Sequence, residues 1–284
     1  MRISRALACF LILGVLLSLV SCEGNGEYAR PSDGEMLVAF IDVGQGDCAV
    51  IRTQDTVIVV DTGCARSDGA ELLSYLRRAG VQRIDLLVIS HPHEDHVGGV
   101  PALLREYDVG ECLMPDLIED SVAFRAAVSA LTEEGCGATR AYAGVSYEYG
   151  GLLLEVLSPT QEFYSDINDA GAVIRVSYGE ISILFTGDVS ADVEKELVRL
   201  HGEALDADIL KVAHHGSVSS TCEAFLSAVA PQYAAISCEA GNEYGFPDMD
   251  VLARLAAIGA EVHRTDTEGT IVFSIKDSVL SIKK

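Results

Sequence analysis

The chain contains the sequence His91-Pro92-His93-Glu94-Asp95-His96, which places three imidazoles and a carboxylate ligand in one short stretch. The arrangement H-x-H-x-D-H has the spacing of a metal-ligand motif, and imidazole combined with carboxylate suits zinc, manganese or iron. The whole chain has only 7 histidines, so three at this spacing argue against a chance polar loop. We therefore interpret residues 91–96 as a metal-binding loop.

The flanking residues place this loop between a strand and a helix. Residues 84–90 are mostly apolar and predict a buried strand. Residues 97–101, Val-Gly-Gly-Val-Pro, turn the chain toward a helical pattern. The candidate ligands therefore stand at the end of a strand, on a loop that enters a helix.

The first 22 residues predict a secretion signal. Arg2 and Arg5 precede a mainly apolar run, 6–20, which is shorter than the ~20 residues of a membrane span. The segment Leu19-Val20-Ser21-Cys22, where this run ends, resembles the lipobox of bacterial lipoproteins, in which the cysteine is lipidated and becomes the new N-terminus. We expect an extracytoplasmic, lipid-anchored protein with a polar tether at 23–35. The alternatives are a secreted protein, if Cys22 is not lipidated, and an uncleaved anchor.

The composition of the chain indicates one globular domain over residues 36–284. Hydrophobic residues make up 49% of the chain and charged residues 22%, which is typical of a folded protein with a large core. The net charge is −23, and binding a long nucleic acid requires clustered Lys and Arg. The charge therefore argues against a broad nucleic-acid surface.

The cysteines do not define a disulfide framework. Beyond Cys22, the six cysteines show no C-x-x-C pair and no zinc-finger spacing. Disulfides are allowed outside the cell, but Cys48 and Cys64 are equally compatible with small buried apolar residues. The sequence assigns no pairing.

Alternating strand and helix patterns follow the signal. Strands are expected at 36–43, 47–52, 56–60, 84–90, 152–157, 172–178, 181–186, 207–213, 233–237, 262–264 and 270–275. Helices are expected at 68–78, after the histidine motif, and at 121–134, 191–201, 220–229 and 250–258. Asp68 with Glu71, and Ser220 with Glu223, have capping-box spacing. The pattern indicates two packed sheets covered by helices on both outer faces.

Four further segments end strand patterns with residues that can bind metals or transfer protons: Asp61-Thr62-Gly63, Thr186-Gly187-Asp188, His214-His215-Gly216-Ser217 and residues 242–247. With the histidine motif, the chain resembles the metallo-β-lactamase superfamily and, within it, the extracellular hydrolase domain of the ComEC family of DNA-uptake channel proteins. The stretches that carry the resemblance are AFIDVGQGDCAVI, VVDTG, SHPHEDHVGG, ILFTGD, DILKVAHHGSVSST and NEYGFP. They cover nearly the entire chain after the signal.

The resemblance implies an α/β (α+β) fold, a four-layer αββα sandwich with the metal site along one edge. It implies that His91 and His93 hold a first ion, and that Asp95 and His96 hold a second. A pair of metal ions ~3.5–4 Å apart needs a bridging group, often a carboxylate. Asp188, after a strand and a glycine, is the natural bridge. Its alternative role is an N-cap for the following helix, for which Ser190 is also available.

The adjacent His214 and His215 have less certain roles in the sequence. The resemblance implies that one faces the metals or protonates the leaving group while the other orients it or packs, and we favour His215 as the ligand. Lys211 is either a buried partner, a phosphate contact or a plain surface lysine. Asp47 and Asp61 are expected to hydrogen-bond to loop backbone or to the ligand histidines.

Two positions depart from the family pattern. Asn168 stands where the superfamily has an additional histidine ligand, as is usual in the ComEC-like group. Phe246 stands where ComEC-like chains have a histidine that completes the second metal site. That site then has Asp95, His96 and Asp188 unless Asp248 or water contributes, which favours manganese over zinc.

These observations predict an extracytoplasmic metal-dependent hydrolase with one or two divalent ions, zinc or manganese. We expect a phosphodiesterase or nuclease with Asp95 and His215 in catalytic roles. The phosphoester substrate is either DNA or a smaller phosphodiester, such as a phosphorylated cell-wall polymer or its choline substituent, and no protein partner is inferable. The alternatives are a catalytically weakened binding module of the same fold and a hydrolase of thioesters or lactones.

Overall fold

The structure is a computed structural model that describes residue 26 and residues 28–283. The expected signal segment and its Cys22 lie outside the described residues. Within the described part of the chain, no helix combines the length and the apolar character needed to cross a membrane.

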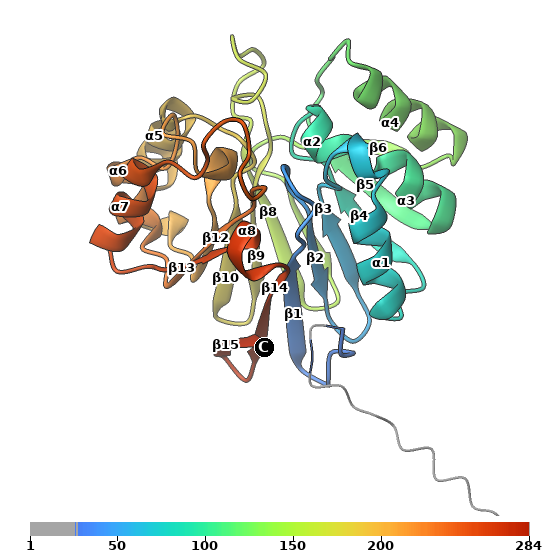
Figure 1. Ribbon diagram of the computed structural model, residues 1–284, viewed down its shortest axis with the longest axis horizontal. Helices are drawn as coiled ribbons and strands as arrows, with labels where there is room; N and C mark the ends of the chain where they lie inside the picture. The colour runs from blue at the N-terminus through green and yellow to red at the C-terminus, as the bar shows by residue number, and fades with distance from the viewer. Residues whose placement is uncertain (1–25, 27, 284) are drawn as a thin grey trace, which may run out of the picture.

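The fold is a sandwich of two mixed sheets between two layers of helices (Figure 1). The first sheet has the order β15-β14-β1-β2-β3-β4-β5-β6 and the second the order β13-β12-β11-β10-β9-β8-β7. The strands of the first sheet are β1 (Glu35–Phe40), β2 (Ala49–Arg52), β3 (Val57–Val60), β4 (Ile84–Val88), β5 (Val109–Met114), β6 (Ala138–Arg140), β14 (Ile271–Lys276) and β15 (Val279–Lys283). Those of the second are β7 (Ser146–Tyr149), β8 (Leu152–Ser158), β9 (Val173–Tyr178), β10 (Ile181–Phe185), β11 (Ile209–Lys211), β12 (Tyr233–Ile236) and β13 (Glu261–Arg264).

Helices cover both outer faces, so the expected four-layer architecture is confirmed. Their bounds are α1 (Ala70–Arg78), α2 (Glu94–Val97), α3 (Val100–Glu106), α4 (Val122–Glu133), α5 (Ala191–His201), α6 (Glu223–Val229), α7 (Met249–Ala257) and α8 (Thr265–Glu268). Helices α1, α3 and α4 pack on the first sheet, and α5, α6 and α7 pack on the second (Figure 1). The faces between the sheets form a third apolar core, in which Phe40 and Phe185 meet with ring centroids 5.8 Å apart.

The strand directions place the candidate site at one edge. Strands β3, β4, β5 and β6 run parallel, as do β10, β11, β12 and β13. Carboxyl ends of parallel strands meet at the same edge of a sheet, and side chains on the loops that follow converge there. The loops after β4, β10 and β11 carry the histidine motif, Asp188 and the His214-His215 pair.

The expected capping box at Asp68 is wrong. Asp68 has a left-handed backbone with φ 49°, and α1 begins at Ala70 after Gly69 without a side-chain cap. The Asp68 carboxylate instead accepts a hydrogen bond from Arg105 at 2.9 Å. A three-residue 3-10 turn precedes the helix and shifts its start past the predicted cap.

The expected capping box at Ser220 is wrong as well. The Ser220 hydroxyl donates to the Val189 carbonyl at 2.8 Å, and α6 begins at Glu223. The backbone N–H groups of Thr221 and Cys222 donate to the carboxylate of Glu194 in α5, at 2.6 and 2.7 Å. A capping partner 27 residues away is invisible to a local pattern.

The structure places residues 28–35, which the sequence assigns to the tether, against the domain. Glu35 begins β1 and pairs with Lys276 of β14. The ring of Tyr28 lies 5.5 Å from that of Tyr75. Residues 28–35 therefore contribute contacts to the folded unit.

Glu35 predicts a pH dependence of stability. Burial raises its pKa, but hydrogen bonds from Ser274, Ser32 and Lys283 outweigh burial and lower the pKa from 4.5 to about 2. The stabilisation is therefore present above pH 4.5 and is lost as the pH falls toward 2. We expect this group to contribute about 1–3 kcal/mol to the free energy of unfolding at neutral pH. Denaturant titrations of Glu35→Gln should show a shallower decline between pH 5 and pH 2 than wild type.

A matched control is Glu180→Gln, which removes an exposed carboxylate from the turn between β9 and β10. It should reproduce the wild-type pH profile. A Glu35→Gln profile identical to wild type would contradict the assignment.

The cysteines among the described residues are free. They are Cys48, Cys64, Cys112, Cys136, Cys222 and Cys238. Cys48 is buried in the core between the first sheet and its helices, as the small-apolar interpretation allows, whereas Cys64 is partly exposed.

Candidate metal centre

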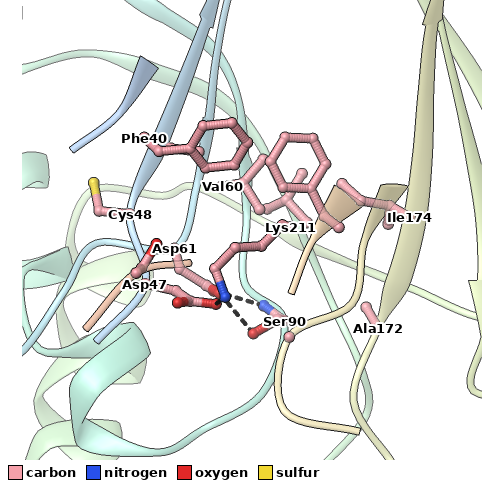
Figure 2. A pocket seen from close by; sticks show the side chains of 14 residues that line it. Phe40, Asp47, Cys48, Val60, Asp61, Ser90, Ala172, Ile174 and Lys211 are labelled. Atoms are coloured by element: carbon pink, nitrogen blue, oxygen red, sulfur yellow. Dashed lines mark hydrogen bonds and ion pairs between the residues drawn. The ribbon is translucent and has the colours of Figure 1, made fainter. Parts of the chain in front are cut away.

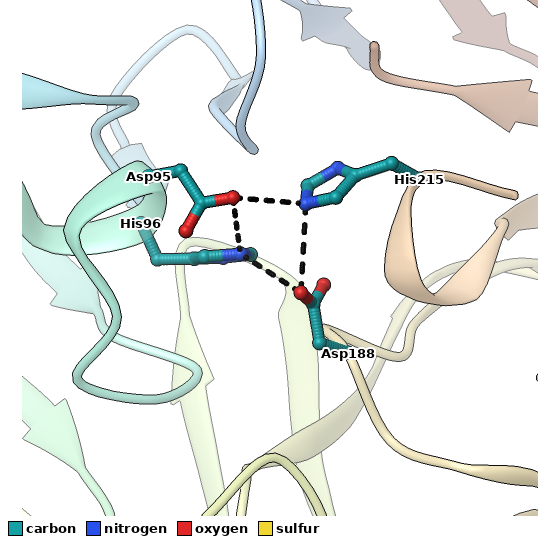
Figure 3. A group of neighbouring side chains, drawn as sticks. All are labelled: Asp95, His96, Asp188 and His215. Atoms are coloured by element: carbon teal, nitrogen blue, oxygen red, sulfur yellow. Dashed lines mark hydrogen bonds and ion pairs between the residues drawn. The ribbon is translucent and has the colours of Figure 1, made fainter. Parts of the chain in front are cut away.

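Side chains from three separate loops meet at the sandwich edge. Asp95 and His96 lie on α2, Asp188 follows β10, and His215 lies in a 3-10 turn (Ala213–Gly216) after β11. One ligand atom from each of the four lies within 4.8 Å of all the others. Figure 3 shows these side chains pointing toward a common centre.

The distances within this four-residue cluster are short, and three of the four residues are buried. The Nε2 atom of His215 lies 3.1 Å from Asp95 Oδ2 and 3.5 Å from Asp188 Oδ2. The Nε2 atom of His96 lies 3.4 Å from Asp188 Oδ2 and 3.8 Å from Asp95 Oδ2. Asp95 is the partly exposed member and opens the cluster to the cleft described below.

The opposite nitrogen of each imidazole is held by an acceptor. His96 Nδ1 lies 2.9 Å from Asp61 Oδ2. His215 Nδ1 lies 3.0 Å from the Ser237 carbonyl oxygen and 3.2 Å from Asp47 Oδ1. An acceptor at Nδ1 keeps the ring proton there and leaves the Nε2 lone pair facing the two carboxylates, which is how ligand histidines are oriented in metal sites.

The cluster fits a divalent cation. His96 Nε2 and Asp188 Oδ1 are buried, and neither has a hydrogen-bond partner among the described residues. Buried polar atoms are normally satisfied, so unpartnered atoms facing one centre indicate a ligand. Two imidazole nitrogens with two carboxylates form a donor set that zinc, manganese and iron accept.

The electrostatics of the cluster favour positive charge at its centre. Burial lowers the pKa of His96, but Asp188, Asp95 and Asp61 outweigh it and raise that pKa well above its usual range. Burial raises the pKa of Asp188, but His215 and His96 outweigh it and lower that pKa well below its usual range. Protons and a metal cation therefore compete for the same carboxylates.

The other two predicted ligands stand beside the cluster. His91 is buried, and its Nε2 lies 3.1 Å from His93 Nδ1 and 3.9 Å from Asp188 Oδ2. Its Nδ1 lies 3.0 Å from the Ser90 hydroxyl, which in turn donates to Asp61 at 2.7 Å. Burial, reinforced by His96, holds the pKa of His91 well below its usual range, so its ring is the neutral form that binds metals.

The two adjacent histidines both approach the cluster because their backbone is left-handed, with φ 50° at His214 and 54° at His215. His215 is buried, and its Nε2 is the closer to Asp188. His214 Nε2 lies 3.8 Å from Asp188 Oδ2, and its ring is 29% exposed toward the cleft. The strained turn thus presents one histidine to the buried cluster and the other to the solvent side.

Lys211 is buried, so both the surface-lysine and the phosphate-contact interpretations are wrong. Its ammonium lies 2.7 Å from Asp47 Oδ2 and donates to the Val212 carbonyl at 2.9 Å, with the side chain 3% exposed. Figure 2 shows Lys211 reaching Asp47 beside Asp61 and Ser90, beneath the apolar side chains between the sheets. The ammonium neutralises the carboxylate that faces His215.

The turn between β1 and β2 is pressed against α2. A Cβ on Gly46, whose φ is 136°, would lie 2.2 Å from the Asp95 carbonyl oxygen, so only glycine fits. The next residue, Asp47, donates its backbone N–H to the same oxygen at 3.1 Å. The contact fixes Asp47 relative to the loop that carries Asp95 and His96.

The structure places both residues that depart from the family pattern, Asn168 and Phe246, near the cluster. Asn168 lines the same cleft as Asp188, and its Oδ1 is buried without a hydrogen-bond partner among the described residues. Phe246 packs edge-on against His214 with ring centroids 5.8 Å apart. The Asp248 carboxylate accepts the Val218 N–H at 2.8 Å and does not join the cluster. His215 provides the fourth donor instead.

A cleft of about 1040 Å³ opens above the cluster and includes Asp95, Asp188, His214 and His215 in its wall.

The sequence analysis did not predict the roles of Ser90 and Ser237, which position His91 and His215, respectively. Both end expected apolar strands, and a polar residue at that position is the signal that could have identified Ser90. Ser237 acts through its backbone carbonyl, which no residue type reveals.

The fold and the cluster agree with the comparison with known families. Residues 41–240 match the family model of the metallo-beta-lactamase superfamily. The chain therefore belongs to the metallo-beta-lactamase superfamily, a superfamily of metal-dependent hydrolases.

Two curated relatives match most of this chain. The chain is 30% identical over 265 residues to ComE operon protein 3 of Bacillus subtilis, an alignment that covers 87% of this chain and 34% of that protein. It is 32% identical over 243 residues to Competence protein ComA of Neisseria gonorrhoeae, covering 86% of this chain and 33% of that protein. The chain thus spans about a third of the length of these relatives.

Solved structures share the fold at low sequence identity. The metallo-beta-lactamase fold protein YhfI from Bacillus subtilis has a TM-score of 0.56 and 13% identity, covering 84% of this chain and 99% of that one. This likeness supports the architecture.

Proposed function

We propose that the protein is an extracytoplasmic, metal-dependent phosphodiesterase. The observation that carries the proposal is the convergence of Asp95, His96, Asp188 and His215 at the floor of an open cleft. The resemblance to a hydrolase domain of DNA-uptake channel proteins supports a phosphodiester as the bond class. The signal-like N-terminus with Cys22 supports the location.

The side chains of this site have separate roles in metal binding, ligand orientation and proton transfer. His91, His93, Asp95, His96, Asp188 and His215 would hold one or two divalent ions, zinc or manganese. Such an ion would act as a Lewis acid on a phosphoryl oxygen and lower the pKa of water enough for attack on phosphorus near neutral pH. Asp61 and Asp47 keep the two buried imidazoles oriented. His214, partly exposed in the cleft, is placed to protonate the leaving oxygen.

The structure weakens the two alternative functions. A weakened binding module would follow from Phe246 and Asn168 in place of ligand histidines, but His215, the favoured ligand of the histidine pair, completes a four-residue donor set at the cluster. A thioester or lactone hydrolase would need an apolar acyl pocket, whereas the cleft is lined mainly by polar and acidic side chains.

The test is an assay of the full chain loaded with Mn²⁺ or Zn²⁺. We expect hydrolysis of bis(p-nitrophenyl) phosphate that is lost on chelation and restored by the metal. Linear DNA, assayed in parallel, should be cleaved poorly because of the chain's charge. Stoichiometric metal without hydrolysis of either substrate would refute the phosphodiesterase and favour the binding module.

A further inference from the structure

The wall of the cleft away from the metal cluster is acidic. Besides Asp95 and Asp188, the carboxylates that line it are Asp42, Glu71, Glu94, Glu239 and Glu243. The basic lining residues are Arg66 and the histidines His93, His214 and His215. Asp188, whose buried Oδ1 lacks a hydrogen-bond partner among the described residues, lines the same cleft. The acidic wall is therefore continuous with the four-residue cluster, whose unpartnered buried carboxylate oxygen indicates a ligand.

The charge of this wall selects against polyanions. A divalent ion at the cluster offsets Asp95 and Asp188 but leaves the five other carboxylates against one arginine. Phosphate-rich strands are bound by clusters of Lys and Arg that replace condensed counterions. The loaded cleft would instead offer a cation that can bind a phosphate oxygen at the cluster and excess negative charge along its wall, which matches a zwitterion.

An exposed aromatic pair stands at the rim of the same cleft. Tyr244 and Phe246 stack with ring centroids 5.5 Å apart and an interplanar angle of 18°. Tyr244 is 61% exposed, and Phe246 contacts His214 beside the cluster. Glu239 and Glu243 line the same cleft as Tyr244. An exposed tyrosine face in an acidic cleft has the negative potential that attracts ammonium groups.

The loop that carries the pair is held in place by its own hydrogen bonds. Asn242 accepts from the Phe246 N–H at 3.0 Å and donates to the Phe246 carbonyl at 2.7 Å. Its side chain also donates to the Glu239 carbonyl at 2.9 Å. The aromatic rings and Glu239 thus belong to one closed loop, which reduces the entropy lost when a ligand binds.

We propose that the cleft recognises a phosphodiester whose second substituent is a quaternary ammonium group, seated over Tyr244 with Glu239 and Glu243 as counter-charges. The inference rests on the proposed phosphodiesterase function and names its substrate class. In the hydrolysis the water oxygen forms a bond to phosphorus and the P–O bond to the leaving group breaks. The proton released from water passes to the leaving oxygen or to solvent.

The test uses three chromogenic diesters that release p-nitrophenol: p-nitrophenylphosphorylcholine, thymidine 5′-(p-nitrophenyl phosphate) and bis(p-nitrophenyl) phosphate. We expect the choline ester to have the lowest KM. In Tyr244→Ala the ratio of kcat/KM for the choline ester to that for bis(p-nitrophenyl) phosphate should fall about fivefold to tenfold. The double variant Glu239→Gln/Glu243→Gln should lower the same ratio about threefold.

Matched controls lie outside the cleft. Phe163→Ala removes an exposed aromatic ring and Glu180→Gln an exposed carboxylate, and neither residue lines the cleft. Both should keep the wild-type ratio. A lower KM for the thymidine ester, or a ratio unchanged in Tyr244→Ala, would overturn the inference and leave the phosphodiesterase standing.

A binding measurement separates the inference from catalysis. Calorimetric titration of choline into the chelator-treated full chain should show binding that weakens at least fivefold in Tyr244→Ala. Choline binding without hydrolysis of any ester would refute the phosphodiesterase and keep the ammonium site. No choline binding to wild type would overturn the ammonium site.

Discussion

Replacement of Asp188 by asparagine is expected to lower metal affinity at least 100-fold and to reduce phosphodiester hydrolysis about 1000-fold or more. Asp188 Oδ2 lies within 4 Å of nitrogen atoms of His91, His96, His214 and His215, so it is the carboxylate common to every part of the site. An amide has nearly the same shape but no charge with which to hold a cation. The measurement is the metal content after dialysis, with the assay in parallel.

The control for this variant is Asp192→Asn. Asp192 lies four residues further along, at the start of α5, and its side chain is exposed outside the cluster. It should keep wild-type metal content and activity. Wild-type metal content in Asp188→Asn would contradict the assignment of Asp188 as the bridging metal ligand.

Replacement of Lys211 by methionine is expected to lower the free energy of unfolding by about 3–5 kcal/mol, because it leaves the buried Asp47 carboxylate without its partner. The melting temperature should fall by roughly 10 °C. Metal affinity should fall about 10-fold to 100-fold, because Asp47 faces His215 Nδ1 and helps to orient that ligand. Thermal denaturation and metal titration measure the two effects separately.

A double variant separates positioning from stability. In Lys211→Met/Asp47→Asn both charges are absent, so most of the lost stability should return while metal affinity stays low. Lys195→Met, which removes an exposed lysine of α5, should behave as wild type. Recovery of metal affinity together with stability in the double variant would show that the pair acts only structurally.

The sequence predicted the layers of the fold well because the central strands are long apolar runs. Strands β5, β6, β7 and β15 were missed. The residues of β6, β7 and β15 are largely polar or exposed and are held mainly by pairing with a neighbour. In β5, Cys112 and Leu113 are buried but Gly110 and Glu111 are exposed, so its apolar run is too short to predict a strand. Both capping boxes failed for a related reason. The groups that satisfy those helix starts, such as Glu194 beside α6, come from elsewhere in the fold.

The sequence predicted the part of the candidate site that lies in one short segment, but it did not predict the contacts between segments that are far apart in the chain. The spacing of His91, His93, Asp95 and His96 is visible in six residues. The contact between Lys211 and Asp47 could not be predicted from the sequence. Lys211 lies in a three-residue strand, and nothing in that strand indicates which carboxylate its ammonium will contact in the other half of the sandwich. The sequence also did not predict the left-handed backbone that brings both His214 and His215 close to Asp188.

The most direct measurement is an anomalous difference map from crystals of the full chain grown with Mn²⁺. The account predicts a peak within bonding distance of Asp95, His96, Asp188 and His215. Manganese bound elsewhere with this cluster left without a peak, or no bound manganese at all, would contradict the central claim that these loops assemble a metal centre.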